Sequence, residues 1–202
     1  MPHRKELIKK AASKKGYQFI IQNVELDNAI VLSSNTMFNF ENIATQNNQA
    51  IINLKRVNDF KDINQYFATV NQKLKTDGIF INLAETYIAR KQRILQKYLK
   101  PFNWIYYIGD VFVTRIAPKL YLTQKLYFYL SGGKGKVLSK TEIFGRLYFS
   151  GFQLLDEKII DNQLYFIAQK IKEPKDKNTT SSYRFLIKLP RIGKNGKTIW
   201  VY

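Results

Sequence analysis

Four basic residues follow the ends of two predicted strands and could bind a phosphate there: Arg56, Arg90, Lys91 and Arg93. The two strands are the apolar runs 50–54 and 79–83, and open α/β sheets bind ligands beyond the carboxyl ends of their strands. Asp59 and Glu85 lie at the same edge, as solvated loop carboxylates or as ion-pair partners of the arginines. The sequence therefore predicts an anion site at this edge, with ion pairs as the alternative.

Residue types that carry much enzyme chemistry are missing or isolated in this sequence. There is no cysteine, which excludes disulfides, zinc–thiolate sites and cysteine nucleophiles. The single histidine, His3, lies in a charged segment without a partner base or further ligands, so we interpret it as solvated. We predict no catalytic residue, no metal site and no cofactor in this chain.

The charge of the chain is strongly positive, with 33 Lys and Arg against 15 Asp and Glu, a formal net charge of +18. Residues 90–147 contribute much of this excess, because Asp110 and Glu142 are the acids of that stretch. Such a field attracts nucleic acid, an anionic membrane face or phosphorylated substrates. Interleaved Tyr and Phe would suit single-stranded nucleic acid, but no helix-turn-helix, RNA-recognition or zinc-finger pattern occurs.

An aromatic segment at 102–116 could lie in a membrane interface, inside a stretch of inserted basic aromatic helices at 97–130. Its rings would lie at headgroup depth, and the flanking cations would face lipid phosphates. The alternative is a core helix packed on the sheet. No apolar run is long enough for an ordinary spanning helix, and residues 1–15 do not form a secretory signal. The candidate membrane-interface residues are Lys97, Lys100, Trp104, Tyr106, Tyr107, Phe112, Arg115 and Lys119.

The elements that position these residues follow an α/β pattern. A strand at 50–54, an amphipathic helix at 61–74 and a strand at 79–83 predict one right-handed βαβ unit. Basic helices are predicted at 4–15 and 86–98. Further strands are expected at 17–21, 29–32, 152–160 and 163–171, the last two joined by a turn at Asp161-Asn162.

Domain organisation follows from the same pattern and from the length of 202 residues. We predict one α/β domain at 1–172, a polar linker at 173–182 and a β-hairpin at 183–202. Ser139 with Glu142 is typical of a capping box and begins a helix that Gly151 closes.

The motifs at Leu74-Lys75-Thr76-Asp77-Gly78, the capped helix 139–148 and the closing hairpin resemble the C-terminal half of a class I S-adenosylmethionine-dependent methyltransferase. The resemblance covers residues 50–171 and implies a Rossmann-like sheet with flanking helices that ends in an antiparallel hairpin. The glycine-rich turn of the cofactor-binding half has no counterpart, since Gly16 is the one glycine before Ala50. We therefore expect a degenerate form of this fold, with active methyl transfer as the alternative function.

The chain from Ala50 onward also resembles the N-terminal part of a bacterial polyprenyl glycosylphosphotransferase, a sugar transferase of exopolysaccharide or capsule synthesis. The runs 52–59, 85–94, 138–142 and 191–202 carry this resemblance. The catalytic acids of that family would follow Tyr202, so none of its catalytic residues maps onto this chain. The resemblance implies a non-catalytic leader or regulatory module that is cytoplasmic and peripheral to the inner membrane.

The partners expected from these arguments are an anionic membrane surface or lipid-linked phosphate, and a sugar transferase catalytic domain. Nucleic acid is the less favoured partner. Because the first half of the methyltransferase-type sheet has no counterpart, an exposed sheet edge could pair with a second copy of the chain.

Overall fold

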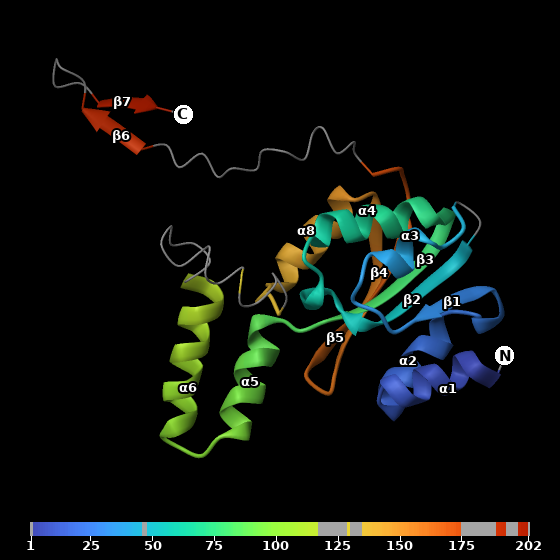
Figure 1. Ribbon diagram of the computed structural model, residues 1–202, viewed down its shortest axis with the longest axis horizontal. Helices are drawn as coiled ribbons and strands as arrows, with labels where there is room; N and C mark the ends of the chain where they lie inside the picture. The colour runs from blue at the N-terminus through green and yellow to red at the C-terminus, as the bar shows by residue number, and fades with distance from the viewer. Residues whose placement is uncertain are drawn as a thin grey trace.

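A five-stranded mixed sheet forms the centre of the protein (Figure 1). The computed structural model describes residues 2–45, 48–116, 129, 135–174, 189–192 and 198–201. The strand order is β1-β2-β3-β5-β4, with β1 to β3 parallel and β5 antiparallel to both of its neighbours. The strands are β1 (Ala29–Leu32), β2 (Asn48–Arg56), β3 (Leu74–Ala84), β4 (Phe152–Ile160) and β5 (Gln163–Lys170).

Helices cover both faces of this sheet and make two cores. In Figure 1, α3, α4 and α8 lie above the sheet, and α1 and α2 lie below it. Strand residues alternate between the two cores, so Ile51 packs under α4 and its neighbour Ile52 packs on the α1–α2 side. The covering helices are α1 (Pro2–Ala11), α2 (Lys14–Asn23), α3 (Phe38–Glu41), α4 (Ile63–Lys73) and α8 (Lys140–Phe149).

The predicted βαβ unit is β2–α4–β3. Asp62 begins α4 as its N-cap, accepting a hydrogen bond from the Gln65 amide at 2.9 Å. Tyr66 then buries its ring against that of Phe60, with stacked centroids 3.7 Å apart. The short helix η2 (Val57–Asp59) links β2 to the segment before α4. Strand, helix and strand are therefore confirmed in the predicted order.

The predicted strand at 17–21 is wrong, because these residues belong to α2. Ser13 accepts a hydrogen bond from the Gly16 amide and caps α2, which begins where the predicted helix 4–15 ends. Gly16, Phe19 and Ile20 are the buried residues of α2, and their i, i+3, i+4 spacing places them on one helix face. Their aromatic and β-branched side chains favour a strand, but packing on the sheet overrides that local preference. The single predicted basic helix at 4–15 is likewise two helices, α1 and the start of α2.

The C-terminal part of the domain confirms the predicted capped helix and hairpin. Ser139 Oγ accepts from the Glu142 amide at 3.0 Å, although the Glu142 carboxylate pairs with Arg146 and not with the cap amide. Asp161 and Asn162 both have positive φ, as a tight two-residue hairpin turn requires. β5 returns between β3 and β4. The sheet is therefore the α/β, Rossmann-like and methyltransferase-type arrangement that the sequence predicts.

The other predicted segments are described in part. β6 (Leu189–Ile192) and β7 (Thr198–Val201) pair antiparallel, as the C-terminal hairpin prediction requires. Of the stretch of inserted helices predicted at 97–130, residues 117–128 and 130 lie outside the described residues, and so does the predicted linker from residue 175 onward. The division into domain, linker and hairpin stays a prediction.

Both edges of the main sheet have features that bear on pairing with a second copy. β1 is an edge strand of four residues. β4 forms the other edge, where the register shifts at Leu155 and charged residues follow at 156–158. A bulge and charges on an edge strand discourage pairing with another chain. Edge pairing remains a prediction, and the described β4 edge is poorly suited to it.

Replacing Gly151 by alanine is expected to lower the free energy of unfolding by about 2–4 kcal/mol. Gly151 ends α8 with φ +88°, and an added Cβ would lie 2.2 Å from the Lys172 carbonyl oxygen and 2.9 Å from Asn71 Nδ2. Urea unfolding followed by circular dichroism measures the loss. Gly145→Ala is the control, because apart from the adjoining backbone of its own helix no atom lies within 4 Å of the added Cβ. Equal stability of the two variants would contradict the expectation.

Candidate functional site

The carboxyl ends of β2 and β3 meet at one edge of the sheet, where Asn58 fixes the position of Glu85. The Asn58 side chain accepts from the Glu85 amide at 2.7 Å and donates to the Glu85 carbonyl oxygen at 2.8 Å. It also donates to the Lys136 carbonyl oxygen at 2.7 Å. Thr86 then caps α5 (Tyr87–Lys97) by accepting from the Ala89 amide. Both residues thus set where the Glu85 carboxylate lies.

Three arginines surround this buried carboxylate. Arg93 Nε lies 2.7 Å from Glu85 Oε1, and Arg56 Nη1 lies 3.0 Å from Oε2. Arg90 Nη1 lies 3.8 Å from the same Oε2. The Glu85 side chain is only 6% exposed, so the carboxylate is almost fully withdrawn from water. Such a group requires charged partners, and the arginines supply them.

Two further carboxylates complete what we call the arginine–carboxylate cluster. Arg90 forms a two-pronged pair with Asp110, at 2.6 and 2.8 Å. Arg56 does the same with Asp59, at 3.2 Å for both contacts. The cluster thus contains three positive and three negative side chains and is formally neutral: Arg56, Arg90, Arg93, Asp59, Glu85 and Asp110.

The structure brings three of the four candidate anion-binding residues together, each engaged by acids. The sequence left open whether these residues bind an anion or form ion pairs. The observed contacts are ion pairs, and phosphate binding stays a prediction. Lys91 lies apart from the cluster, with its ammonium 5.3 Å from the Trp104 ring centre and 5.4 Å from that of Tyr107. Asp110 and Asn58 were not predicted. Asp110 is the one acid between residues 90 and 141, a signal that could have indicated a partner for an arginine.

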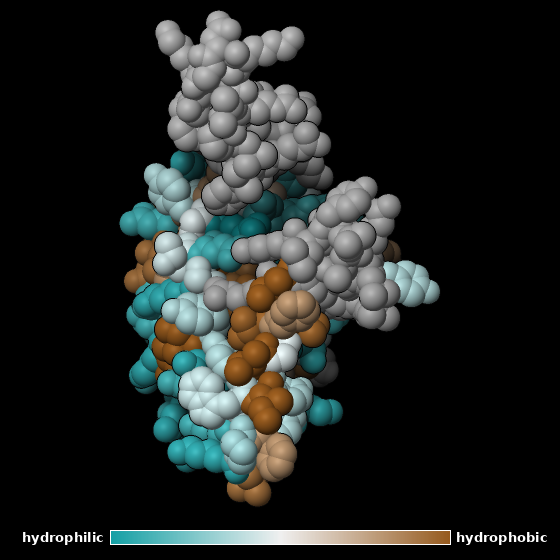
Figure 2. Space-filling model, turned by 90° about the vertical axis from the view of Figure 1, so that its left-hand side faces the viewer, coloured by the Kyte–Doolittle hydropathy of each residue, from teal (hydrophilic) through white to brown (hydrophobic). Residues whose placement is uncertain are grey.

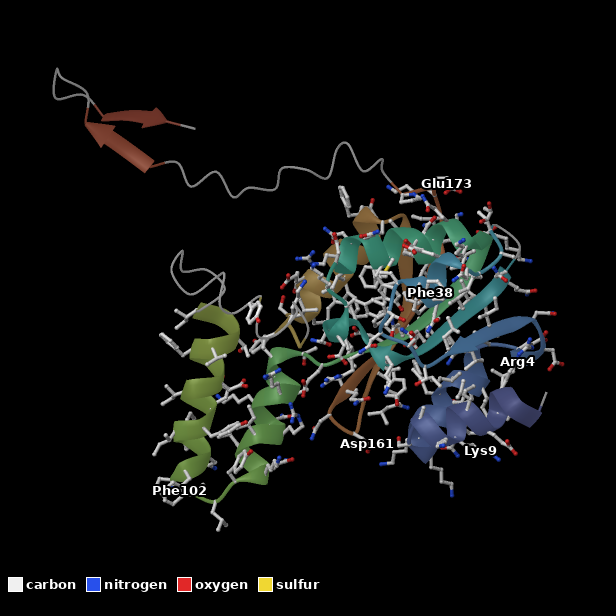
Figure 3. All side chains as sticks on the ribbon, viewed as in Figure 1. Arg4, Lys9, Phe38, Phe102, Asp161 and Glu173 are labelled. Carbon is white, nitrogen blue, oxygen red and sulfur yellow. The ribbon has the colours of Figure 1, made fainter. Side chains whose placement is uncertain are left out.

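Helices α5 and α6 (Phe102–Val111) form a hairpin that projects beyond the edge of the sheet, with Phe102 at its tip (Figures 1 and 3). The Arg90–Asp110 pair joins the two helices near the sheet. Asn103 joins them near the tip by donating to the Leu95 carbonyl oxygen at 3.1 Å. A π-helical segment, η3 (Phe112–Ile116), continues α6. The cluster therefore fixes the base of this hairpin.

The outer face of this hairpin is apolar and exposed. Figure 2 shows apolar side chains in a column along the side of the molecule that carries α6. Ile105 and Ile108 are each 64% exposed and Phe112 is 50% exposed. The alternative of a core helix packed on the sheet is therefore wrong. We call this surface the α6 face, and its exposed apolar residues are Phe102, Trp104, Ile105, Tyr106, Ile108, Phe112, Val113 and Ile116.

The candidate membrane-interface residues lie on or beside the α6 face where the structure describes them. Trp104, Tyr106 and Phe112 are exposed on it, and Lys97 and Lys100 are exposed near the hairpin tip. Tyr107 is partly buried. A hydrogen bond with Tyr98 raises the pKa of Tyr106. The side chain of Arg115 and all of Lys119 lie outside the described residues.

The loop after β1 is where a methyltransferase-type sheet would bind the cofactor that the resemblance implies. Ser34 lies in this loop, and its amide donates to Asn53 Oδ1 at 3.2 Å while its carbonyl oxygen accepts from Asn53 Nδ2 at 3.0 Å. Its backbone groups are thus engaged within the protein. No glycine lies in this loop, and no described strand lies beyond β1 to supply an acid for a ribose. The residues of this edge do not fit S-adenosylmethionine.

Below this loop, two buried asparagines share one tyrosine hydroxyl. Asn53 and Asn82 donate to Tyr66 Oη at 2.9 and 2.6 Å. Sequence reasoning missed this network, although both asparagines occur in the same Ile-Asn-Leu triplet of two apolar strands. A polar residue repeated at one position of two buried strands indicates a shared hydrogen-bond partner.

Replacing Tyr66 by phenylalanine is expected to cost about 1–3 kcal/mol at neutral pH, because buried amide groups lose their acceptor. Burial raises the pKa of Tyr66 above its ordinary value of 10.0, so the folded protein keeps a proton that the unfolded chain loses above pH 10. Wild-type stability then falls with rising pH, and the variant lacks this contribution. Urea unfolding should show that the difference in unfolding free energy between the wild type and the variant is about 1.4 kcal/mol smaller one pH unit above the ordinary tyrosine pKa than at neutral pH. A pH-independent difference would contradict this assignment.

No family model matches the sequence, and no curated protein matches it. Solved structures that resemble the chain include a methyltransferase bound to the Trm112 activator from Haloferax volcanii, with 7% identity, 66% of this chain and 59% of that one covered, and a TM-score of 0.43. A second is described as an S-adenosylmethionine-dependent methyltransferase from Listeria monocytogenes, with 16% identity, 66% and 67% covered, and a TM-score of 0.42. A third is such an enzyme from Thermotoga maritima, with 9% identity, 64% and 59% covered, and a TM-score of 0.38.

All three proteins are named as methyltransferases. Their TM-scores lie below 0.5, so these likenesses carry no weight for activity. The chain spans about 59% of the length of two of them. The assignment of the fold rests on the strand order and the reversed β5 described above.

None of the helices that the structure describes is long and apolar enough to cross a membrane. Among the same residues, no three His, Cys, Asp or Glu side chains are grouped so that they could hold a metal ion.

Proposed function

We propose that this chain is a non-catalytic module that docks on an anionic membrane face through the α6 face, beside a sugar transferase of surface polysaccharide synthesis. The observation that carries the docking proposal is the exposed apolar side of α6 and η3, which no described element covers. Contiguous exposed apolar surface of this kind marks a site of protein or membrane contact.

The chemistry of the α6 face suits a lipid interface. Trp104 and Tyr106 combine an apolar ring with a polar group, as residues at headgroup depth do. The Lys91 ammonium lies over the rings of Trp104 and Tyr107, so a cation lies beside the apolar surface. Each Lys or Arg near an anionic surface contributes about 1 kcal/mol to binding. The formal charge of +18 adds long-range attraction of the same sign.

The link to a sugar transferase rests on the sequence resemblance of residues 50–202 to the leader of that family. Transfer of a phosphosugar to a lipid phosphate takes place at a membrane face. A module that adds affinity for that face would hold an attached or associated catalytic domain close to its lipid substrate, because linked binding raises effective concentration.

Vesicle co-sedimentation tests the docking proposal. Vesicles of phosphatidylglycerol and phosphatidylcholine should carry the chain into the pellet at low salt, and pure phosphatidylcholine vesicles should carry less. Binding to the anionic vesicles should weaken in high salt without disappearing, since the apolar contribution is not screened. Failure to bind anionic vesicles at low salt overturns the proposal. Salt-sensitive binding of single-stranded oligonucleotides without vesicle binding would assign the charge to nucleic acid.

Methyl transfer is the second candidate, favoured by the reversed strand β5 that the methyltransferase resemblance implies. The bonds between Asn53 and the Ser34 backbone argue against it. Isothermal titration with S-adenosylmethionine decides the matter. Micromolar binding would make methyl transfer the leading function, and no heat at high ligand concentration would remove it.

A further inference from the structure

A second surface, distant in the fold from the α6 face, contains a pocket of about 420 Å³. One wall is a single face of α2, contributed by residues 15, 18, 19 and 22. The other wall is the tip of the β4–β5 hairpin, residues 158–161. In Figure 3, Asp161 marks this tip beside the α1–α2 pair. The volume lies in the range of small-molecule sites.

The floor of the pocket is apolar and fixed. Phe19 and Ile160 line it, and each is only 5% exposed. Phe19 contacts the Tyr165 ring edge to face, with centroids 6.0 Å apart. Gly16 allows this approach of α2 to the sheet, because a Cβ there would lie 2.4 Å from the Tyr165 hydroxyl. The floor is therefore held by the packing of the core and is preformed.

The rim of the pocket offers cations and amides that have no partner among the described residues. Lys15 and Lys158 line it without a hydrogen bond or ion pair, and the same holds for the side chains of Gln18 and Gln22. Asp161 is the one acid of the lining, so the pocket has a formal charge of +1. Two ammonium groups and two amides above an apolar floor suit an anionic head on a flat apolar body.

We propose that this pocket binds a small organic anion of the aryl phosphate class, independently of membrane docking. The phosphate oxygens accept from Lys15, Lys158 and the glutamine amides, and the ring lies on Phe19 and Ile160. The exposed side chain of Ile159 closes one side of the ring. Nothing in this arrangement involves α6, so the two sites can be tested separately.

Amide chemical-shift mapping with phenyl phosphate tests the proposal on the full chain. We expect the largest shifts at residues 18–22 and 158–161. The double variant Lys15→Gln/Lys158→Gln should raise the dissociation constant at least about tenfold, because two charge-assisted contacts are lost. Ile159→Asp should weaken binding, because the new carboxylate repels the phosphate and the contact of Ile159 with the ring is lost. Because the Ile159 side chain is exposed, the substitution should leave the protein folded.

Lys75→Gln is the control, because this exposed lysine lies outside the pocket and its substitution removes one positive charge, as each substitution of the double variant does. Its affinity for phenyl phosphate should equal that of the wild type. Two results overturn the proposal. One is an equal response to inorganic phosphate, which would reduce the site to nonspecific charge attraction, and the other is a response to phenyl phosphate confined to residues outside the pocket.

Discussion

Replacing Glu85 by glutamine should lower the free energy of unfolding by about 2–4 kcal/mol. The substitution keeps the shape of the side chain and removes the charge that Arg56, Arg90 and Arg93 share. Removing one member of a fully buried ion pair costs about 3–5 kcal/mol. The expectation is set lower because Arg93 is 48% exposed and can turn toward water, and Arg56 retains Asp59.

Asp59→Asn is the control for this prediction. Its pair with Arg56 is more exposed, and Arg56 keeps Glu85 as a partner, so we expect a loss of about 1 kcal/mol or less. Urea unfolding at neutral pH, followed by circular dichroism, measures both variants. Equal losses of unfolding free energy in the two variants would show that Glu85, at the centre of the cluster, stabilises the fold no more than Asp59 does. The Glu85 variant also tests the anion-site hypothesis, since phosphate should bind better once the cluster carries a net positive charge.

The double variant Ile105→Asp/Phe112→Asp should weaken binding to anionic vesicles by about 100-fold or more. Burying the exposed part of each of these side chains contributes about 1–2 kcal/mol, and repulsion of each new carboxylate by the anionic surface costs about 1 kcal/mol more. Two such losses exceed the 2.8 kcal/mol that corresponds to about 100-fold. Because both residues are at least 50% exposed, folding should be unaffected.

The matched control is Leu155→Asp on β4, since Leu155 is 50% exposed like Phe112 but lies away from α6. It adds one negative charge and removes one exposed apolar group, yet vesicle binding should change by about threefold at most, through net charge alone. A similar loss in both variants would assign binding to overall charge. An unchanged affinity of the double variant would exclude the α6 face as the contact.

The parts of this protein that were predictable from sequence are those whose periodicity is local. The β2–α4–β3 unit, helix α5 and the β4–β5 hairpin each combine a clear apolar period with a cap or turn residue. The strand predicted at 17–21 is wrong because the composition of these residues suits a strand and a helix equally well. Their burial against β5 stabilises the helix. The exposure of α6 could not be predicted, since an apolar helix suits a core equally well.

The sequence was enough to predict where the candidate site lies, but not which side chains pair with one another there. The ends of two adjacent strands placed Arg56 and Glu85 at one edge. The partner of Arg90 is Asp110, which lies 20 residues away across a helix hairpin whose packing has no local signature. Glu85 resembled a solvated loop residue, because the Asn58 side chain that withdraws it from water comes from another strand end. Contacts of this kind depend on the assembled fold.

The position of β5 has a consequence for how the chain folds as it is synthesised. β3 pairs with β5 at positions such as Ile79 and Gln169. One edge of β3 therefore stays unpaired during synthesis until about ninety further residues have left the ribosome. During that interval a nearly continuous apolar strand has an unpaired edge, open to other nascent chains. Slow translation through residues 85–160 would prolong this exposure. The yield of folded protein should therefore depend on elongation rate and on chaperones that shield strand edges.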